Sequence, residues 1–278
     1  MYQIIKNQFK LMLSKKNFWI GFFVVSFYAL ASYLLNAKGY YNKDLSQLLD
    51  RRELVCFHTD DNMAKYFQLL FPFLVILPFS LSYFEDCESN MIGFWLRRTG
   101  RKKYHIARAM VCFLGSFFMI ALPFFVNLLL VWTTFPQNGN LYLGTIHTEL
   151  FSLETEGLHG VGEPYWYPFL SVYLFHPFVY NCMYILFLAV LSGILGVVAY
   201  VSSFFIKKHK LVLFLPVYLF IWVLSMLTPL ANDFELDPIS YAMRGLESGN
   251  YLYFVGIVGI LTILSVILIK MYSKRDVQ

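Results

Sequence analysis

The sequence has little charge and few of the residues that build soluble active sites. Charged residues make up 14% of its 278 positions, against about a quarter in soluble domains, and 58% are hydrophobic. The four cysteines form no Cys-x-x-Cys pair, which argues against a disulfide framework or a cysteine zinc site. The formal net charge of +5 is too small to suggest a nucleic-acid partner.

Common nucleotide-binding and catalytic sequence motifs are also missing. There is no Gly-x-x-x-x-Gly-Lys-Ser/Thr loop, no Gly-x-Ser-x-Gly and no His-Glu-x-x-His, so we expect no catalytic residue, metal or cofactor in this chain. His105 and His209 lie among basic residues, where a solvated or lipid-facing role is favoured over catalysis. No apolar segment carries a clear charge of the kind that ion-driven carriers use. Energy for any transport would therefore enter from a partner.

What the sequence does contain is a series of long apolar segments. A spanning helix needs about 20 mostly apolar residues. Six segments qualify, at about 17–37, 66–84, 109–135, 177–204, 211–232 and 251–269. The fold class predicted is therefore an all-α integral membrane protein, with residues 17–270 forming a domain of six transmembrane helices.

The charges between these segments predict the orientation. Alternating spans place 16 of the 22 basic residues on one side, together with both termini, and 13 of the 17 acidic residues on the other. The positive-inside rule then puts both termini in the cytoplasm, in a multi-pass protein of the cell membrane.

The N-terminal segment, 1–16, has apolar and basic residues on different helical faces. Ile5, Phe9, Met12 and Leu13 share one face, which is typical of a helix lying in the membrane interface and contacting lipid. Residues 271–278 form a short cytoplasmic tail. Within the spans, we expect the amides of Asn127 and Asn181 to bond neighbouring helices.

The longest predicted cytoplasmic segment, 85–108, carries the strongest functional signal. Three acidic residues come first, a patch of large apolar residues follows, and a basic run leads into the third span. A short amphipathic helix with an exposed aromatic patch suits insertion into a cleft of another protein. An ordinary cytoplasmic loop would not need that apolar patch.

This arrangement resembles the permease subunits of type-2 ABC exporters, which have an N-terminal interfacial helix, six spans and an acid-led coupling segment between spans two and three. Here Glu85 or Glu88 is the acid, 94–96 the apolar part, 97–101 the basic turn and Tyr104 the return into the membrane. Ser89-Asn90 stands where the family often has Gly-Thr. Such permeases also carry a membrane-dipping segment before span six, at 233–250 in this chain.

The resemblance implies a subunit that transmits ATP hydrolysis by a separate ATPase, with its own ATP and Mg, to the export of an amphipathic peptide or lipid-like substrate. It also implies a second permease copy, identical or not. The ATPase interface implied is Glu85, Asp86, Glu88, Met91, Phe94, Trp95, Leu96, Arg97, Arg98 and Arg101. An apolar substrate path would be lined by Phe67, Phe71, Phe73, Tyr218, Phe220 and Trp222.

Two other classes of function stay open. A membrane scaffold or immunity protein would use the same cytoplasmic segment without transporting anything. A membrane-embedded enzyme acting on lipid would need clustered polar ligands, and only Cys56, His58, Asp60 and Asp61 come near.

Overall fold

A computed structural model describes residues 1–41, 43, 50–52, 54–56, 62–137, 169, 172, 175–206, 209–228, 236–244 and 251–274. Every regular element in these ranges is a helix. In chain order they are α1 (Tyr2–Leu13), α2 (Lys16–Tyr40), α3 (Asn62–Ile76), α4 (Ser82–Glu88), α5 (Ile92–Thr99), α6 (Arg101–Thr134), α9 (Pro177–Ser202), the 3-10 helix η2 (Lys210–Phe214), α10 (Leu215–Leu227), α11 (Pro238–Arg244) and α12 (Tyr251–Lys274).

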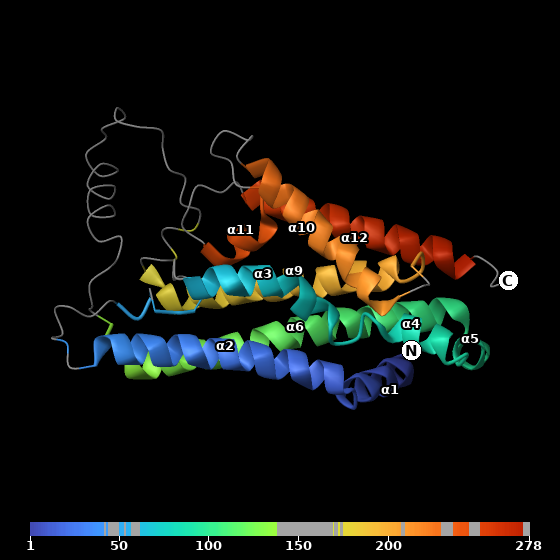
Figure 1. Cartoon of the computed structure of the whole chain (residues 1–278), viewed down its shortest axis with the longest axis horizontal. Helices are drawn as coiled ribbons and strands as arrows, with labels where there is room; N and C mark the ends of the chain where they lie inside the picture. The colour runs from blue at the N-terminus through green and yellow to red at the C-terminus, as the bar shows by residue number, and fades with distance from the viewer. Residues whose placement is uncertain are drawn as a thin grey trace.

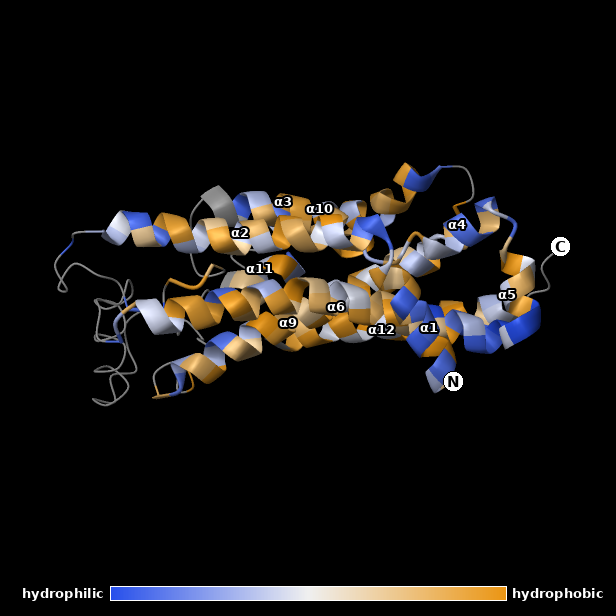
Figure 2. Ribbon diagram, turned by 90° about the horizontal axis from the view of Figure 1, so that it is seen from below, coloured by the Kyte–Doolittle hydropathy of each residue, from blue (hydrophilic) through white to orange (hydrophobic). Residues whose placement is uncertain are grey.

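The long helices run side by side along one axis (Figure 1). The start of α1 and the end of α12 lie at the same end of this bundle as α4 and α5. Polar residues gather at that end, whereas the middle of the bundle is apolar (Figure 2). Five helical stretches are long and apolar enough to cross a membrane: Lys16–Tyr40, Arg101–Thr134, Pro177–Ser202, Lys210–Leu227 and Leu252–Ser273. The chain is therefore an all-α, multi-pass membrane protein.

Most predicted boundaries lie close to the helices. The fourth predicted span starts at Pro177, which stands in the first turn of α9, where its missing amide hydrogen costs nothing. The third begins earlier than predicted. Gly100 has φ +77° and turns the chain directly into α6 at Arg101, so residues 101–108 belong to a helix rather than to a loop.

The second predicted span, 66–84, is not one continuous helix. α3 ends at Ile76, and a turn over residues 77–81 separates it from α4. Pro78 explains the break, because proline lacks an amide hydrogen and disfavours helical geometry in the residue before it. This segment appears as a 15-residue helix followed by a short one, whereas the other five predicted spans each contain a helix of spanning length.

Neighbouring helices satisfy the backbone at this break. The Ser116 hydroxyl on α6 donates to the Val75 carbonyl oxygen at 2.6 Å, and the Ser80 hydroxyl donates to the Gly196 carbonyl oxygen on α9 at 2.8 Å. In a bilayer, a broken helix is tolerated only where protein or water replaces the lost backbone bonds. The Ser116 bond thus satisfies a backbone carbonyl at the end of α3, and the Ser80 bond joins the turn to α9.

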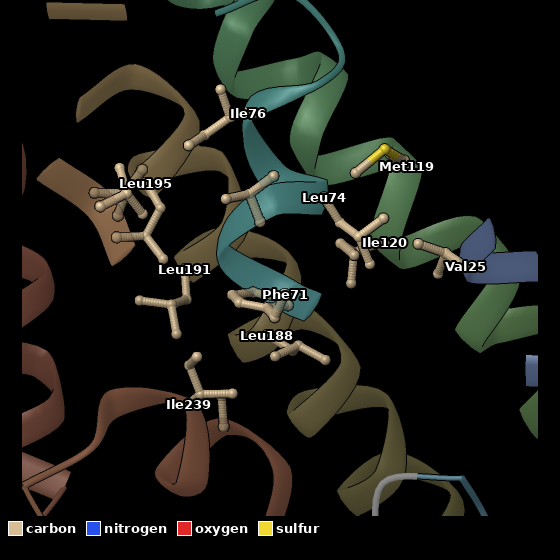
Figure 3. Close-up of a cluster of buried hydrophobic side chains, with 14 of the residues drawn as sticks. Val25, Phe71, Leu74, Ile76, Met119, Ile120, Leu188, Leu191, Leu195 and Ile239 are labelled. Carbon is tan, nitrogen blue, oxygen red and sulfur yellow. The ribbon is translucent and has the colours of Figure 1, made fainter. Parts of the chain in front are cut away.

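Small residues let α6 and α9 approach closely, and this pair has the most extensive helix contact among the described elements. Gly193 faces the Phe113 ring, Gly196 faces Ser116, and Ser192 donates to the Ser116 carbonyl oxygen at 3.0 Å. Small residues at such crossings permit van der Waals packing between backbones. Apolar side chains of α3 fill the space beside this pair (Figure 3), including Phe71, Leu74 and Ile76.

At the other end of the bundle, polar residues connect short segments to the long helices. As predicted, Asn127 bonds a neighbour: its amide donates to the Ala29 carbonyl oxygen at 2.7 Å, and its oxygen accepts from the Cys56 amide. Within the predicted membrane-dipping segment, α11 packs on α9 and α12, and its Ile239 is buried in the core (Figure 3).

The N-terminal amphipathic segment forms α1, as its pattern predicts. Met12 is fully buried against Gly115 of α6, and Ile5 and Phe9 also pack on the core, while Leu13 is exposed. Much of the apolar face of α1 therefore contacts the bundle itself. Its contact with lipid stays a prediction.

The orientation can be tested by cysteine labelling in intact cells. With the four native cysteines replaced by serine, Gln47→Cys should react with a membrane-impermeant maleimide, because the charge distribution places it outside. Arg98→Cys should react only after the membrane is opened. The opposite pattern would refute the orientation. Labelling of both cysteines in intact cells would refute the placement of the two segments on opposite sides of the membrane.

The close packing of α6 against α9 predicts the effect of enlarging Gly196. A Cβ at Gly196 would meet the Ser116 hydroxyl and lie 3.2 Å from the Val75 carbonyl oxygen. Overpacking a filled core typically costs about 1–3 kcal/mol. Gly196→Val should therefore lower the thermal unfolding midpoint in detergent. The control is Gly256→Val on α12, where nothing lies within 4 Å of the added atom. Equal effects of the two substitutions would contradict the packing described here.

Candidate functional site

The site begins with the turn between α4 and α5. Asn90 adopts φ +55°, the Met91 amide donates to the Asp86 carbonyl oxygen at 3.0 Å, and the Asn90 amide donates to the Cys87 carbonyl oxygen at 3.2 Å. These two bonds form the Schellman motif that ends many helices, in which glycine or asparagine takes the left-handed position. Ser89-Asn90, which departs from the family pattern, thus supplies a specific helix stop.

The three acidic residues of α4 each pair with a base on a different element. Glu85 pairs with Lys15, which lies between α1 and α2; Asp86 pairs with Arg108 of α6; and Glu88 pairs with Lys210 of η2 at 2.7 Å. These pairs join α4 to three parts of the bundle that lie far apart in the sequence. The acids predicted to face an ATPase therefore bind within the chain.

Arg108 is the most deeply buried charge of this cluster. Its side chain is fully buried, pairs with Asp86, and lies over the rings of Phe79 and Tyr104 at 4.8 and 5.1 Å from their centres. Tyr104 also donates a hydrogen bond to Asp86. The sequence placed Arg108 at the end of the predicted cytoplasmic segment 85–108. In the structure, α6 starts at Arg101 and carries Arg108 into the protein interior.

An aromatic cluster lies next to the buried pair and joins four helices. His105 Nδ1 is 2.8 Å from the Tyr200 hydroxyl of α9, and the Tyr83 hydroxyl of α4 is 3.0 Å from the Tyr272 hydroxyl of α12. Phe204 stacks on Tyr272 with ring centres 4.3 Å apart. The solvated or lipid-facing role expected for His105 was wrong, since its ring is buried and bonded; His209 is exposed.

α5 projects from this anchored helix and contains no fully buried residue. Met91 is 47% exposed and Phe94 is 52% exposed, while Trp95 and Leu96 pack partly against the core. Of the predicted interface bases, Arg97 and Arg98 are exposed and Arg101 lies half-buried in the first turn of α6. The predicted interface is thus divided. Glu85 and Asp86 of α4 are partly buried in ion pairs and Glu88 is paired but exposed, whereas Met91 before α5 and Phe94, Arg97 and Arg98 within it point outward.

The six aromatic residues of the predicted substrate path do not share one surface. Phe67 and Phe71 are buried in the core, where Phe67 stacks on Tyr28. Phe73 and Tyr218 are neighbours, with ring centres 5.4 Å apart, at the contact of α3 with α10. On α10, Phe220 is half-buried and Trp222 is 46% exposed. The structure therefore gives no continuous path through these residues.

Of the four polar residues considered as an enzyme site, the structure describes only Cys56. That thiol is buried, and burial raises its pKa well above the ordinary value, so it stays protonated at neutral pH. His58, Asp60 and Asp61 lie outside the described residues. Among the residues described, no cluster of three or more His, Cys, Asp or Glu is placed to hold a metal ion.

Removing the partner of Arg108 should destabilise the protein strongly. Asp86→Asn leaves the guanidinium buried without a counter-charge, and breaking a buried pair in this way costs about 3–5 kcal/mol. We expect a large fall in the thermal unfolding midpoint of the purified protein. Glu88→Gln is the matched control, because that pair is exposed and contributes on the order of 0–1 kcal/mol.

A double substitution separates charge from shape. Asp86→Asn with Arg108→Met removes both charges and should recover much of the lost stability, since an apolar side chain of similar length can replace a buried ion pair. If Asp86→Asn behaves like Glu88→Gln, the burial assigned to Arg108 is incorrect.

No family model matches this chain, and no curated protein or solved structure is significantly similar to it. The resemblance to exporter permeases therefore rests on the order of the helices and on the α4–α5 segment alone.

Proposed function

We propose that this chain is the membrane-spanning subunit of an ATP-driven exporter, with α5 as the docking element for a separate ATPase. The observation that carries the proposal is the pairing of an outward-facing helix with an anchored one. α5 exposes Met91 and Phe94 at the polar end of the bundle, while α4, directly before it, is tied to three other elements by ion pairs.

This arrangement suits the transmission of movement. Movement of a partner bound to α5 would displace α4, because only the short turn at Asn90 separates the two helices. Displacement of α4 would then bear on α6 through Arg108 and on the α1–α2 junction through Lys15. ATP, with its Mg, would bind in the partner and shift the permease between two states, so that no chemistry takes place in this chain.

The remaining parts of the proposal follow from topology and composition. The protein lies in the cell membrane with both termini, and hence α5, in the cytoplasm. A second permease copy pairs with it, and the exposed apolar side chains of α2, such as Phe23 and Phe27, offer one surface for that contact. An amphipathic peptide or lipid-like molecule is the substrate class, because the bundle is apolar and aromatic-rich.

The scaffold or immunity protein is the second candidate, favoured by the same exposed α5. It would bind one partner and move nothing. The lipid-modifying enzyme is less favoured, since the thiol of Cys56 is buried and protonated.

Purification from the native cell in mild detergent tests the proposal. The wild-type chain should retain a protein that hydrolyses ATP, and Phe94→Asp should reduce its recovery at least tenfold, because loss of a buried aromatic contact at an interface centre often exceeds 2 kcal/mol. Tyr2→Asp is the control, since Tyr2 is also an exposed aromatic residue and its helix, α1, lies at the same end of the bundle as α5. Equal recovery in both variants would refute docking through α5.

A transport measurement distinguishes the exporter from the scaffold. Vesicles containing the chain and its ATPase should accumulate a fluorescent amphipathic peptide or lipid only with ATP, and Phe94→Asp should abolish that accumulation. A stable complex that shows no ATP-dependent movement of either probe would favour the scaffold. A chain that purifies without any nucleotide-binding partner would refute both the exporter and its coupling segment.

A further inference from the structure

A groove of about 550 Å³ lies on the outside of the bundle between α6, α9 and α12. Its floor is apolar and includes Ile106, Phe113, Val197 and Ile269. Its volume is within the range of about 300–1,000 Å³ found for small-molecule sites. Neither the ATPase docking helix nor the ion-pair cluster lines it, so it is separate from the site described above.

One end of the groove is basic. Lys102, in the first turns of α6, and Lys270, in the last turns of α12, both line it, together with Ser273. Both lysines are exposed, and no acidic residue is among the lining residues. The groove is therefore amphipathic along its length, with cations at the end of the bundle that holds the termini and hydrocarbon below them.

The length of the groove matches one leaflet of a bilayer. Along α6 its lining runs from Lys102 to Phe113, and along α12 from Ser273 back to Thr262. Each stretch rises about 16 Å at 1.5 Å per residue. Half of a hydrocarbon core is about 15 Å thick. A lipid with its headgroup at the lysines would therefore extend its chain along the groove without crossing the midplane.

A serine that lines the groove has a buried hydroxyl without a partner among the described residues. This residue, Ser265, is 3% exposed, and its Oγ makes no hydrogen bond to any residue in the described part of the chain. Buried hydroxyls normally have a partner. Ser265 lies five residues before Lys270 on α12, about 7.5 Å from it along the helix axis.

We propose that this groove binds one anionic phospholipid of the leaflet nearest the termini, with its phosphate between Lys102 and Lys270 and an acyl chain along the apolar floor. Basic pockets between membrane helices recognise acidic headgroups in this way. A second copy of this chain fits less well, since a two-fold pairing across the groove would bring its lysines close to the same lysines of the partner. This assignment does not depend on the ATPase-coupled role.

Lipid titration of the full-length protein tests the proposal. Native mass spectrometry from a neutral detergent would follow binding of phosphatidylglycerol and of phosphatidylcholine with the same acyl chains. We expect tighter binding of phosphatidylglycerol to the wild type. Lys102→Gln with Lys270→Gln should weaken phosphatidylglycerol binding about 25-fold, roughly fivefold for each lysine near the headgroup. Phosphatidylcholine binding should weaken much less, because its choline cation offsets the charge of the same phosphate.

Two matched controls keep the test specific. Lys6→Gln with Lys103→Gln removes the same charge from exposed residues that do not line the groove, and should leave binding of both lipids unchanged. Thr262→Trp fills the groove from an exposed position and should weaken binding of both lipids, whereas Ile263→Trp, beside it and outside the groove, should not. Unchanged unfolding midpoints would show that every variant is folded.

Three results would overturn the proposal. The first is equal binding of the two lipids by the wild type. The second is an equal loss of phosphatidylglycerol binding in both lysine pairs, which would indicate only a general attraction to positive charge. The third is a Thr262→Trp variant that binds phosphatidylglycerol normally but loses a dimer seen in the wild type, which would assign the groove to a second copy of the chain.

Discussion

The burial of Arg108 is the constraint on which the end of the bundle near the termini depends. A guanidinium without solvent needs a counter-charge, and Asp86 provides it from α4, a helix that begins only after the second pass of the chain has been broken. Asp86 in turn accepts from Tyr104, and Phe79 covers the guanidinium from the turn at the break. The position of α4, and with it the projection of α5 from the bundle, follows from satisfying this one charge. The flanking pairs of Glu85 and Glu88 then hold the same helix to the α1–α2 junction and to η2.

The break between α3 and α4 follows the same rule for backbone polar groups. A helix that stops inside an apolar bundle leaves carbonyl oxygens without partners, and each would cost several kcal/mol in hydrocarbon. The Ser116 hydroxyl donates to a carbonyl oxygen at the end of α3, and the Ser80 hydroxyl donates to the Gly196 carbonyl oxygen. Gly196 has no side chain, which leaves room for Ser116. The centre of the bundle is consequently a tight contact of α3, α6 and α9, in which a change of shape is costly. The end with α4 and α5 is held by ion pairs and aromatic contacts around Arg108 and Tyr272.

Two different surfaces meet at that end. α5 presents an apolar residue pair and two arginines to the aqueous side, as a docking element for a protein would. The groove between α6, α9 and α12 presents hydrocarbon with two lysines at its mouth, as a lipid site would. Both involve α6, which contacts α5 and carries Lys102 of the groove in its first turns. A lipid in the groove and a partner on α5 would therefore both act on the start of α6.

The sequence by itself determined the helical class, the location of the long apolar segments and the helix at the N-terminus, because hydrophobic length and periodicity are local properties. It also marked α5 as an unusual apolar patch and predicted the bonding of Asn127. It did not show that span two is broken, although Pro78 was a visible signal, nor that residues 101–108 continue as helix. Only the tertiary structure decided which way a side chain faces: that Asp86 and Arg108 meet inside, that His105 is buried, that the aromatic residues of α3 and α10 do not form one path, and that Lys102 and Lys270 share a groove. These depend on residues that the fold brings together, from Asp86 and Arg108, 22 positions apart, to Lys102 and Lys270, 168 positions apart along the chain; a charge is buried only when the fold brings it a partner.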